Sequence, residues 1–321
     1  MDTAQWYQEF ARDTREESPA YERLAVAVAE DDELLRQLDQ LPEPKRQPNL
    51  LFAATRFMGG PVDAPAAFRH WVLRHWPDLA LTMLARSTQT NEPARCASLL
   101  PILANLPEPL ALLEVGAAAG LCLYPDAYRY RYDGHAVGRP DSPVRIDCAV
   151  SGEVPLPVRV PEVVWRTGID LNPLDVAEPD DMRWLESLIW PGQQERLDRL
   201  WAAVGIVRAD PPMIRPSDLL VELPTLAAEA PRDATLVVFH SAVLCYLTRE
   251  ARTAFVGLVE SLPGHWISNE APDVLPGLLT SIQLSPAGPS RFVLALDGEP
   301  LGLAASHGQA LHWLPPATFR K

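Results

Sequence analysis

The chain has 321 residues, 47% of them hydrophobic, which is enough to bury a sizeable core in one large domain or in two smaller ones. It carries 42 acidic against 28 basic residues, a net charge of −14, and no run of basic residues offsets this excess. Such a charge repels phosphate backbones and anionic membranes. We therefore expect neither nucleic acid nor a membrane as a partner.

Three further features indicate where the protein resides. The amino terminus lacks the basic start and apolar run of a signal peptide. The longest apolar run, "ATLVVFHSAVLCYL", is too short to span a bilayer. The four cysteines are scattered, without the close pairs of a zinc site or a disulfide scaffold. These features predict a cytoplasmic protein with reduced thiols and no bound metal.

The first 106 residues are predicted to form helices. Ser18, followed by Pro19, and Asp31 are expected to begin two of them. Further helices are expected over residues 49–58, over 64–76 and after Pro93. Pro107 marks the expected boundary of this helical N-terminal region, which is a candidate lid for a second domain over 107–321.

The second domain alternates short apolar runs with helical stretches, which is typical of a mostly parallel α/β sheet. The last runs read as an antiparallel meander at the edge of the sheet, and a stretch at about 129–160 is expected to form an insertion with strands of its own. This insertion either shapes a substrate site or covers the sheet edge. The predicted parallel strands are "LALLEV", "EVVWRTGIDL", "PPMIRPSD", "ATLVVFH" and "GHWISNE".

The segment "LLEVGAAAGLCL" reads as a strand, a glycine turn and a helix. Glu114 stands near the end of the strand, and Gly116 and Gly120 allow a tight turn and a close approach of a ligand. Ala118 occupies the position between them. A glycine pair after a strand also occurs in a plain turn, so this segment alone does not define a cofactor loop.

Acidic residues follow the next two predicted strands. Asp170 ends "WRTGID", where a carboxylate can accept hydrogen bonds from the hydroxyls of a ribose. Asp218 follows the third strand and could receive the amino group of an adenine. The alternative is local, because Asp170 with Asn172 can stabilise a turn and Asp218 can cap a helix.

Polar residues at the ends of the later strands are candidates for catalysis. His240 ends "LVVFH" and could remove a proton from a substrate. Asn269 and Glu270 end the following strand and could orient a polar substrate. A buried histidine bonded to backbone and a capped loop are the alternatives, and Tyr246 either lines the pocket or packs in the core.

A polar cluster precedes the second domain in "TQTNEPARC". Asn91, Glu92 and Arg95 either contribute contacts to a substrate or simply begin a helix with Pro93 in its first turn.

These segments together resemble the successive signature segments of class I S-adenosylmethionine-dependent methyltransferases. The resemblance covers residues 107–315 and is most specific in "GIDLNP". The whole chain also resembles an uncharacterised bacterial family, domain of unknown function 2332, through "QTNE", "DLNPLD", "HSAV" and an "SNE"-like segment.

The resemblance implies a Rossmann-like, methyltransferase-type fold and assigns roles to particular residues. Glu114 would hold the amino acid end of the cofactor, the loop from Gly116 through Ala118 to Gly120 would surround it, and Asp170 with Leu171 and Asp218 would hold the nucleoside. Two features depart from the pattern: Ala118 replaces a glycine, and the 54 positions between Gly116 and Asp170 exceed one strand-helix-strand unit.

We therefore expect an S-adenosylmethionine-dependent methyltransferase acting on a small polar molecule. The alternative is a non-catalytic member of the fold that binds a nucleotide or a protein partner. A serine hydrolase at Ser241 is disfavoured, because its neighbours are not the small residues that a nucleophile turn requires. The acceptor and the oligomeric state are not defined by the sequence.

Overall fold

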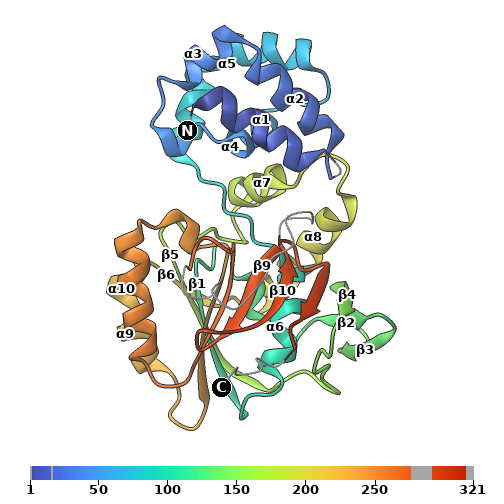
Figure 1. The fold of residues 1–321 in the computed structure, drawn as a ribbon, viewed down its shortest axis with the longest axis vertical. Coiled ribbons are helices and arrows are strands. Elements are labelled where there is room, and N and C mark those ends of the chain that lie inside the picture. The colour runs from blue at the N-terminus through green and yellow to red at the C-terminus, as the bar shows by residue number, and fades with distance from the viewer. Residues whose placement is uncertain (1, 16, 276–290, 316–321) are drawn as a thin grey trace. The chain divides into compact units, whose positions relative to one another are not determined.

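A computed structural model describes residues 2–15, 17–275 and 291–315 (Figure 1). The chain divides into two compact units, one formed by Met1–Thr90 with Asp175–Asp198 and the other by Asn91–Leu174 with Arg199–Lys321. The first unit thus ends before the predicted boundary at Pro107 and includes a segment from the later part of the chain. The residues of "TQTNEPARC" from Asn91 onward belong to the second unit.

The first unit is helical. Aromatic rings fill its core, where Phe52 lies 4.8 Å from Tyr21 and 5.6 Å from Phe68, measured between ring centroids. Asp31 accepts hydrogen bonds from the N–H groups of Glu33 and Leu34, as expected of a helix N-cap. The elements are α1 (Thr3–Thr14), α2 (Pro19–Ala29), α3 (Asp32–Leu38), η1 (Glu43–Lys45), α4 (Pro48–Phe57), α5 (Pro65–Ala85) and α7 (Pro179–Leu188).

The second unit contains one sheet, whose order among the described strands is β3-β2-β4-β11-β10-β9-β8-β7-β1-β5-β6. Strands β6, β5, β1, β7 and β8 are parallel, and β9, β10 and β11 pair antiparallel with their preceding neighbours. The strands are β1 (Leu110–Val115), β2 (Arg129–Tyr132), β3 (His135–Gly138), β4 (Arg145–Ser151), β5 (Val163–Asp170), β6 (Met213–Pro216), β7 (Thr235–Ser241), β8 (His265–Glu270), β9 (Arg291–Leu296), β10 (Glu299–Ala305) and β11 (Ala310–Trp313).

This architecture is a Rossmann-like α/β fold with antiparallel C-terminal strands and a helical N-terminal region, as the sequence predicts. After the inserted strands β2, β3 and β4, the chain adds β5 and β6 on one side of β1 and then β7 on its other side. Strand order therefore reverses between β1 and β7. In open α/β sheets, ligands bind outside the carboxyl ends of the strands at such a switch point.

Helices cover both faces of the sheet in the second unit (Figure 1). On one face, Leu223 and Phe255 of the helices α9 (Leu219–Glu229) and α10 (Arg249–Glu260) are buried in a cluster with Val238 and Trp266. On the other face, α6 (Cys96–Leu103) packs against β4 and β9. These helices bury the central strands of the sheet, and the carboxyl ends of those strands are where a ligand can bind. Helix α8 spans Gln194–Ala209, and two further 3₁₀ turns are η2 (Pro93–Arg95) and η4 (Leu244–Tyr246).

The C-terminal strands are not at the edge of the sheet, so this expectation is wrong. Strand β11 pairs in parallel with β4, and the sheet continues through β2 to β3. The reason is that the stretch after β1 supplies three strands that extend the sheet beyond the meander. The alternation of "RYRY" predicts a strand, but it does not indicate which other strand it pairs with.

The glycine turn after β1 does not lead into a long helix. It continues into η3 (Leu121–Leu123), a single 3₁₀ turn. Asn91 Oδ1 accepts the N–H of Leu121, and Pro125 lies two residues after the end of η3. The Leu121 N–H is thus bonded to a side chain, and Pro125 has no N–H to continue a helix. The long helix that the apolar residues suggested therefore does not form.

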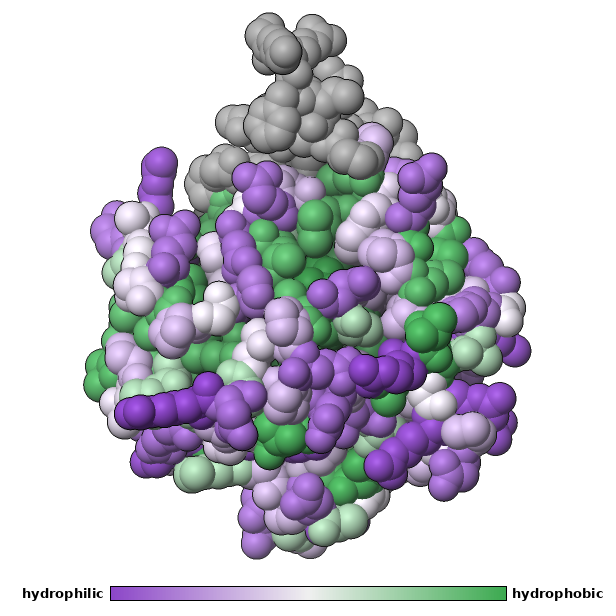
Figure 2. Space-filling view, turned by 90° about the horizontal axis from the view of Figure 1, so that it is seen from below, coloured by the Kyte–Doolittle hydropathy of each residue, from purple (hydrophilic) through white to green (hydrophobic). Residues whose placement is uncertain are grey.

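No helix in the described part of the chain is long and apolar enough to cross a membrane. Figure 2 shows hydrophilic residues over much of the face seen from below, with hydrophobic residues exposed between them.

Candidate functional site

The loops that follow β1 and β7 meet at the switch point. Gly116 begins the first loop, and a Cβ atom added to it would lie 2.4 Å from Cγ2 of Val243 in the second. The missing side chain of Gly116 therefore allows the two loops to pack together, and the contact places both of them at the carboxyl edge of the sheet.

The β1 loop has a left-handed backbone at alternate residues, with φ of 71° at Gly116, 49° at Ala118 and 73° at Gly120. The N–H groups of Gly116 and Ala117 both donate to Ile169 O, which ties the loop to β5. Alanine at such a φ costs about 1–2 kcal/mol relative to the right-handed region. The structure thus adopts at Ala118 the backbone that the missing glycine would favour.

Asp170 joins the end of β5 to this loop. Its Oδ2 accepts the N–H of Ala118 at 2.9 Å, and its Oδ1 accepts the N–H of Asn172 at 2.8 Å. The turn-stabilising role weighed from the sequence is therefore present. A carboxylate at the end of a strand is also a group that can accept hydrogen bonds from the hydroxyls of a ligand. Leu171 follows and is 68% exposed.

Glu114 lies beneath the loop, on β1, and is 4% exposed. Desolvation by burial, reinforced by Cys122, raises the pKa of its carboxyl well above the usual 4.5, although Arg95 opposes the shift. No described residue bonds to its Oε2 atom. A buried carboxylate oxygen without a donor is costly, so this atom is suited to a ligand that supplies an N–H group.

Arg95 crosses the same edge from the start of α6. Its Nε donates to Ser306 O at 3.0 Å, and its Nη1 donates to Ser241 O at 3.1 Å at the end of β7. Two carbonyl groups thus fix the guanidinium near Glu114.

The two residues before Pro93 have local roles. Glu92 Oε1 accepts from Arg199 Nε at 2.7 Å and from the N–H of Ala94, as a cap would. Asn91 holds Leu121 of η3. The bonds of Asn91 and Glu92 are therefore made within the protein, and the bond of Asn91 stabilises the chain after the β1 loop. This role differs from direct contact with a substrate.

His240 is fully buried, and both ring nitrogens have partners. Trp266 Nε1 lies 2.9 Å from Nε2, and Glu270 Oε1 lies 2.7 Å from Nδ1. Because an indole N–H can only donate, Nε2 is the accepting nitrogen and Nδ1 carries the proton given to Glu270. This arrangement does not favour the prediction that His240 removes a proton from a substrate.

Glu270 also holds the β7 loop, since its Oε1 accepts the N–H groups of Val243 and Leu244. Arg252 on α10 holds the same loop from its carbonyl side through Leu244, Cys245 and Leu247. Ala242 within the loop has a φ of 58°. Two charged side chains thus maintain a strained segment over Gly116, as is common at ligand sites.

The remaining predicted residues lie in different settings. Asn269 is buried; its Nδ2 donates to Ser241 Oγ, and its Oδ1 has no partner among the described residues. Tyr246, on the β7 loop, is 63% exposed. Asp218 caps α9 through the N–H of Leu220 and lies after β6, two strands from β1. The structure therefore gathers the other predicted residues around β1 and β7 and leaves Asp218 apart.

Sequence reasoning did not find Trp266, Arg252 or Val243. Trp266 and Arg252 read as ordinary core and helix residues, and their bonds to His240 and to the β7 loop arise only from strand pairing. In the described part of the chain, no group of three His, Cys, Asp or Glu side chains could hold a metal ion.

The fold and this edge define a Rossmann-like α/β protein with a candidate small-ligand site at the switch point. Residues 4–60 and 58–313 match the family described as "Uncharacterized protein conserved in bacteria (DUF2332)". The match extends over most of the chain, which therefore belongs to this family. No curated protein and no solved structure matches the chain.

Proposed function

We propose that the carboxyl edge around β1 and β7 binds S-adenosylmethionine and that the protein transfers its methyl group to a small polar acceptor. The observation that carries the proposal is the bond between Asp170 Oδ2 and the N–H of Ala118. This bond joins Asp170, the residue expected to bind the ribose, to the loop expected to surround the cofactor. The resemblance of "GIDLNP" to methyltransferase segments supports the choice of cofactor.

Two residues fit such a ligand by their chemistry. Glu114 offers a buried carboxylate oxygen without a described partner, which suits the ammonium of an amino acid. Asp170 offers accepting oxygens at the strand end, beside the exposed Leu171, which suits a ribose next to an apolar ring. Val243 occupies the space above Gly116, so the ligand would lie alongside this contact instead of on the glycine itself.

When bound, the sulfonium supplies an electrophilic methyl group, and the residues of the edge have to align an acceptor with it. Asn269 Oδ1 can accept an N–H or O–H of that acceptor, since it has no described donor. Arg95, fixed by Ser241 and Ser306, places a positive charge near Glu114. Glu270 holds the β7 loop, and His240 is bonded to Glu270, so we assign both residues positioning roles and no proton transfer.

A second candidate is a protein that binds a nucleotide without turning it over. The engagement of His240 by Trp266 and Glu270 favours it, because the strongest candidate base is occupied. Cofactor binding alone therefore does not separate the two functions, and a methyl-acceptor screen has to follow.

Isothermal titration with S-adenosylmethionine and with NAD tests the proposal. We would titrate the protein freed of carried-over ligand, beside the variants Glu114→Gln and Asp170→Asn. The asparagine retains an acceptor for the N–H of Ala118 while removing the charge. Asp141→Asn, at an exposed position of the second unit, is the matched control.

We expect binding of S-adenosylmethionine alone, at least tenfold weaker in both site variants and unchanged in the control. Equal binding in Asp170→Asn and the original protein, or no binding at all, would overturn the proposal. Binding of NAD with the same sensitivity would assign the edge to a dinucleotide instead.

A further inference from the structure

The pairing of β2 with β4 brings together three arginines that are separated in the sequence. Arg129 and Arg131 alternate with two buried tyrosines on β2, and Arg145 begins β4. We call Arg129, Arg131 and Arg145 the arginine cluster. It stands out because the chain as a whole carries a net charge of −14.

Strand register places two of these charges side by side. In the parallel pairing of β2 with β4, Arg129 is opposite Arg145, and Arg131 is opposite Asp147. Arg131 forms an ion pair with Asp147 at 2.6 Å, and Arg129 donates to the carbonyl of Pro140 at 3.1 Å. The side chain of Arg145 has no partner among the described residues. Like charges on directly opposed residues destabilise a sheet.

The strand that carries the cluster is firmly held from its other face. The rings of Tyr130 and Tyr132 stack with an interplanar angle of 7°, and both are buried. Tyr130 Oη donates to Pro125 O, and Tyr132 Oη donates to Ala97 O of α6, each at 2.8 Å. The arginines therefore project from a rigid backbone, so an anion meets a preformed arrangement of donors.

A cavity of about 300 Å³ opens beside these arginines, lined by the arginine cluster with Tyr130, Ala136, Ile146 and Asp147. Its lining carries three guanidinium groups and one carboxylate, which leaves two positive charges. Guanidinium groups bind phosphate oxygens through paired N–H donors. We propose that the arginine cluster binds a small phosphate-bearing ligand, with one phosphate bridging Arg129 and Arg145.

This site is independent of the carboxyl edge. It accounts for the opposed arginines, because a bridging anion converts their repulsion into attraction to a shared partner. A small ligand is favoured over a nucleic acid, because the acidic balance of the whole chain opposes a long phosphate backbone.

Titration with inorganic pyrophosphate tests the site, with adenosine diphosphate as a second arm. The variant Arg145→Gln removes a charge that makes no described contact, and Arg139→Gln removes an exposed arginine of the same insertion that does not line the cavity. Thermal unfolding without ligand, and titration with S-adenosylmethionine, accompany each variant.

We expect pyrophosphate to bind, at least fivefold more weakly in Arg145→Gln and equally in Arg139→Gln. Without ligand, Arg145→Gln should melt at the same or a higher temperature, since the repulsion is gone. Stronger binding of adenosine diphosphate would show that the site also recognises a nucleoside, and equal binding would show that phosphate suffices. Absent binding, or equal loss in both variants, would overturn the proposal whatever the outcome with S-adenosylmethionine.

Discussion

The two ends of β8 carry similar groups in opposite settings. At its amino end, His265 Nδ1 lies 2.7 Å from Asp297 Oδ2, and these side chains are 32% and 48% exposed. At its carboxyl end, Glu270 lies at the same distance from Nδ1 of His240, and both side chains are almost fully buried. One strand thus presents a histidine–carboxylate pair to water at one end and encloses another in protein at the other.

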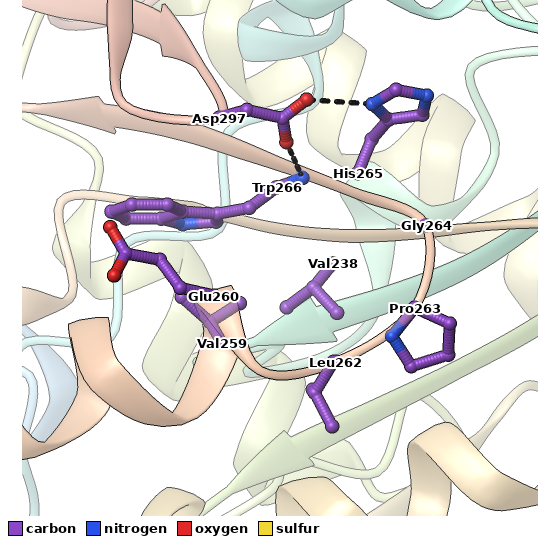
Figure 3. A pocket seen from close by; sticks show the side chains of 9 residues that line it. All are labelled: Val238, Val259, Glu260, Leu262, Pro263, Gly264, His265, Trp266 and Asp297. Atoms are coloured by element: carbon purple, nitrogen blue, oxygen red, sulfur yellow. Dashed lines mark hydrogen bonds and ion pairs between the residues drawn. The ribbon is translucent and has the colours of Figure 1, made fainter.

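The turns beside these pairs differ as well. Asp297 has a φ of 51° and is followed by Gly298 at 82°, as a tight hairpin requires. Figure 3 shows Asp297 bonded to His265 and to the N–H of Trp266, beside a cavity of about 170 Å³. At the carboxyl end, Ala242 adopts a left-handed backbone outside any hairpin.

The left-handed residues at the two ends of the sheet therefore have different explanations. Hairpin geometry explains the left-handed Asp297, whereas nothing in the strand pairing requires alanine to be left-handed at residues 118 and 242. Both alanines flank the switch point, where Glu114, Asn269 and Glu270 also have buried oxygens without described partners. Strain and unsatisfied acceptors therefore gather at the carboxyl edge, which supports a ligand site there.

The largest expected effect comes from the buried carboxylate. Glu270→Gln places an amide N–H₂ group in a buried site and weakens bonds to His240, Val243 and Leu244, so we expect a loss of about 3 kcal/mol in the free energy of unfolding. Asp297→Asn, at the exposed end, should cost less than about 1 kcal/mol. Urea unfolding measures both. Equal losses would remove the contrast between the two ends.

Glycine substitutions sharpen the same contrast. Gly116→Ala adds a left-handed alanine and a clash with Val243, and we expect a loss of about 2–3 kcal/mol. A Cβ at Gly298 meets no atom within 4 Å, so Gly298→Ala should cost only about 1–2 kcal/mol, from its left-handed backbone. In the Gly116→Ala background, Val243→Ala should recover the part due to the clash, as a double-mutant cycle would show.

Glu114, near the carboxyl end of β1, and Glu108, before its amino end, should change stability with pH in opposite directions. Its raised pKa means that the folded protein holds the proton more tightly, so this group's contribution to stability falls as pH rises above about 4.5. Glu114→Gln removes this loss. The variant should therefore gain stability relative to the original protein as pH rises, by up to about 1.4 kcal/mol per pH unit.

Glu108, before β1, is the opposite case. Desolvation of its carboxyl is outweighed by hydrogen bonds from Arg159 and from the N–H of Glu162, so its pKa is lowered. Its contribution is present above about pH 4.5 and is lost as pH falls through the folded pKa. Glu108→Gln should thus show a small difference of opposite sign in urea unfolding between pH 3 and 8. A common sign in both variants would contradict this account.

The strands of the parallel sheet were predictable because each is a short apolar run with a turn at its end. Predicted runs ending at Val115, His240 and Glu270 coincide with β1, β7 and β8 to within a residue. The position of β11 was not predictable, because its neighbour β4 comes from an insertion about 160 residues earlier, and pairing between distant strands leaves no local pattern.

The sequence predicted which residues lie at the strand ends of the candidate site, but it did not predict what each of them contacts there. Asp170 and Glu114 were expected at the edge and lie there, because parallel strands bring their carboxyl ends together. The partners of His240 were not foreseeable, since Trp266 shares a sheet face with it only through the register of β7 and β8. The alternation of residues along a strand predicts which face of the sheet a side chain lies on. Its contacts depend on the register with the neighbouring strand.

The smallest expected effect concerns the loop itself. Ala118→Gly relieves a left-handed alanine at φ 49° but adds chain entropy to the unfolded state, so we expect a net gain of about 0–1 kcal/mol. Ala119→Gly, at a neighbour without a positive φ, should lose about 0.5–1 kcal/mol instead. If alanine is retained at 118 because its methyl group shapes the ligand site, Ala118→Gly will change the affinity for S-adenosylmethionine while Ala119→Gly alters stability alone. Identical affinities in both variants would mean that the strain at Ala118 belongs to the turn and has no part in binding.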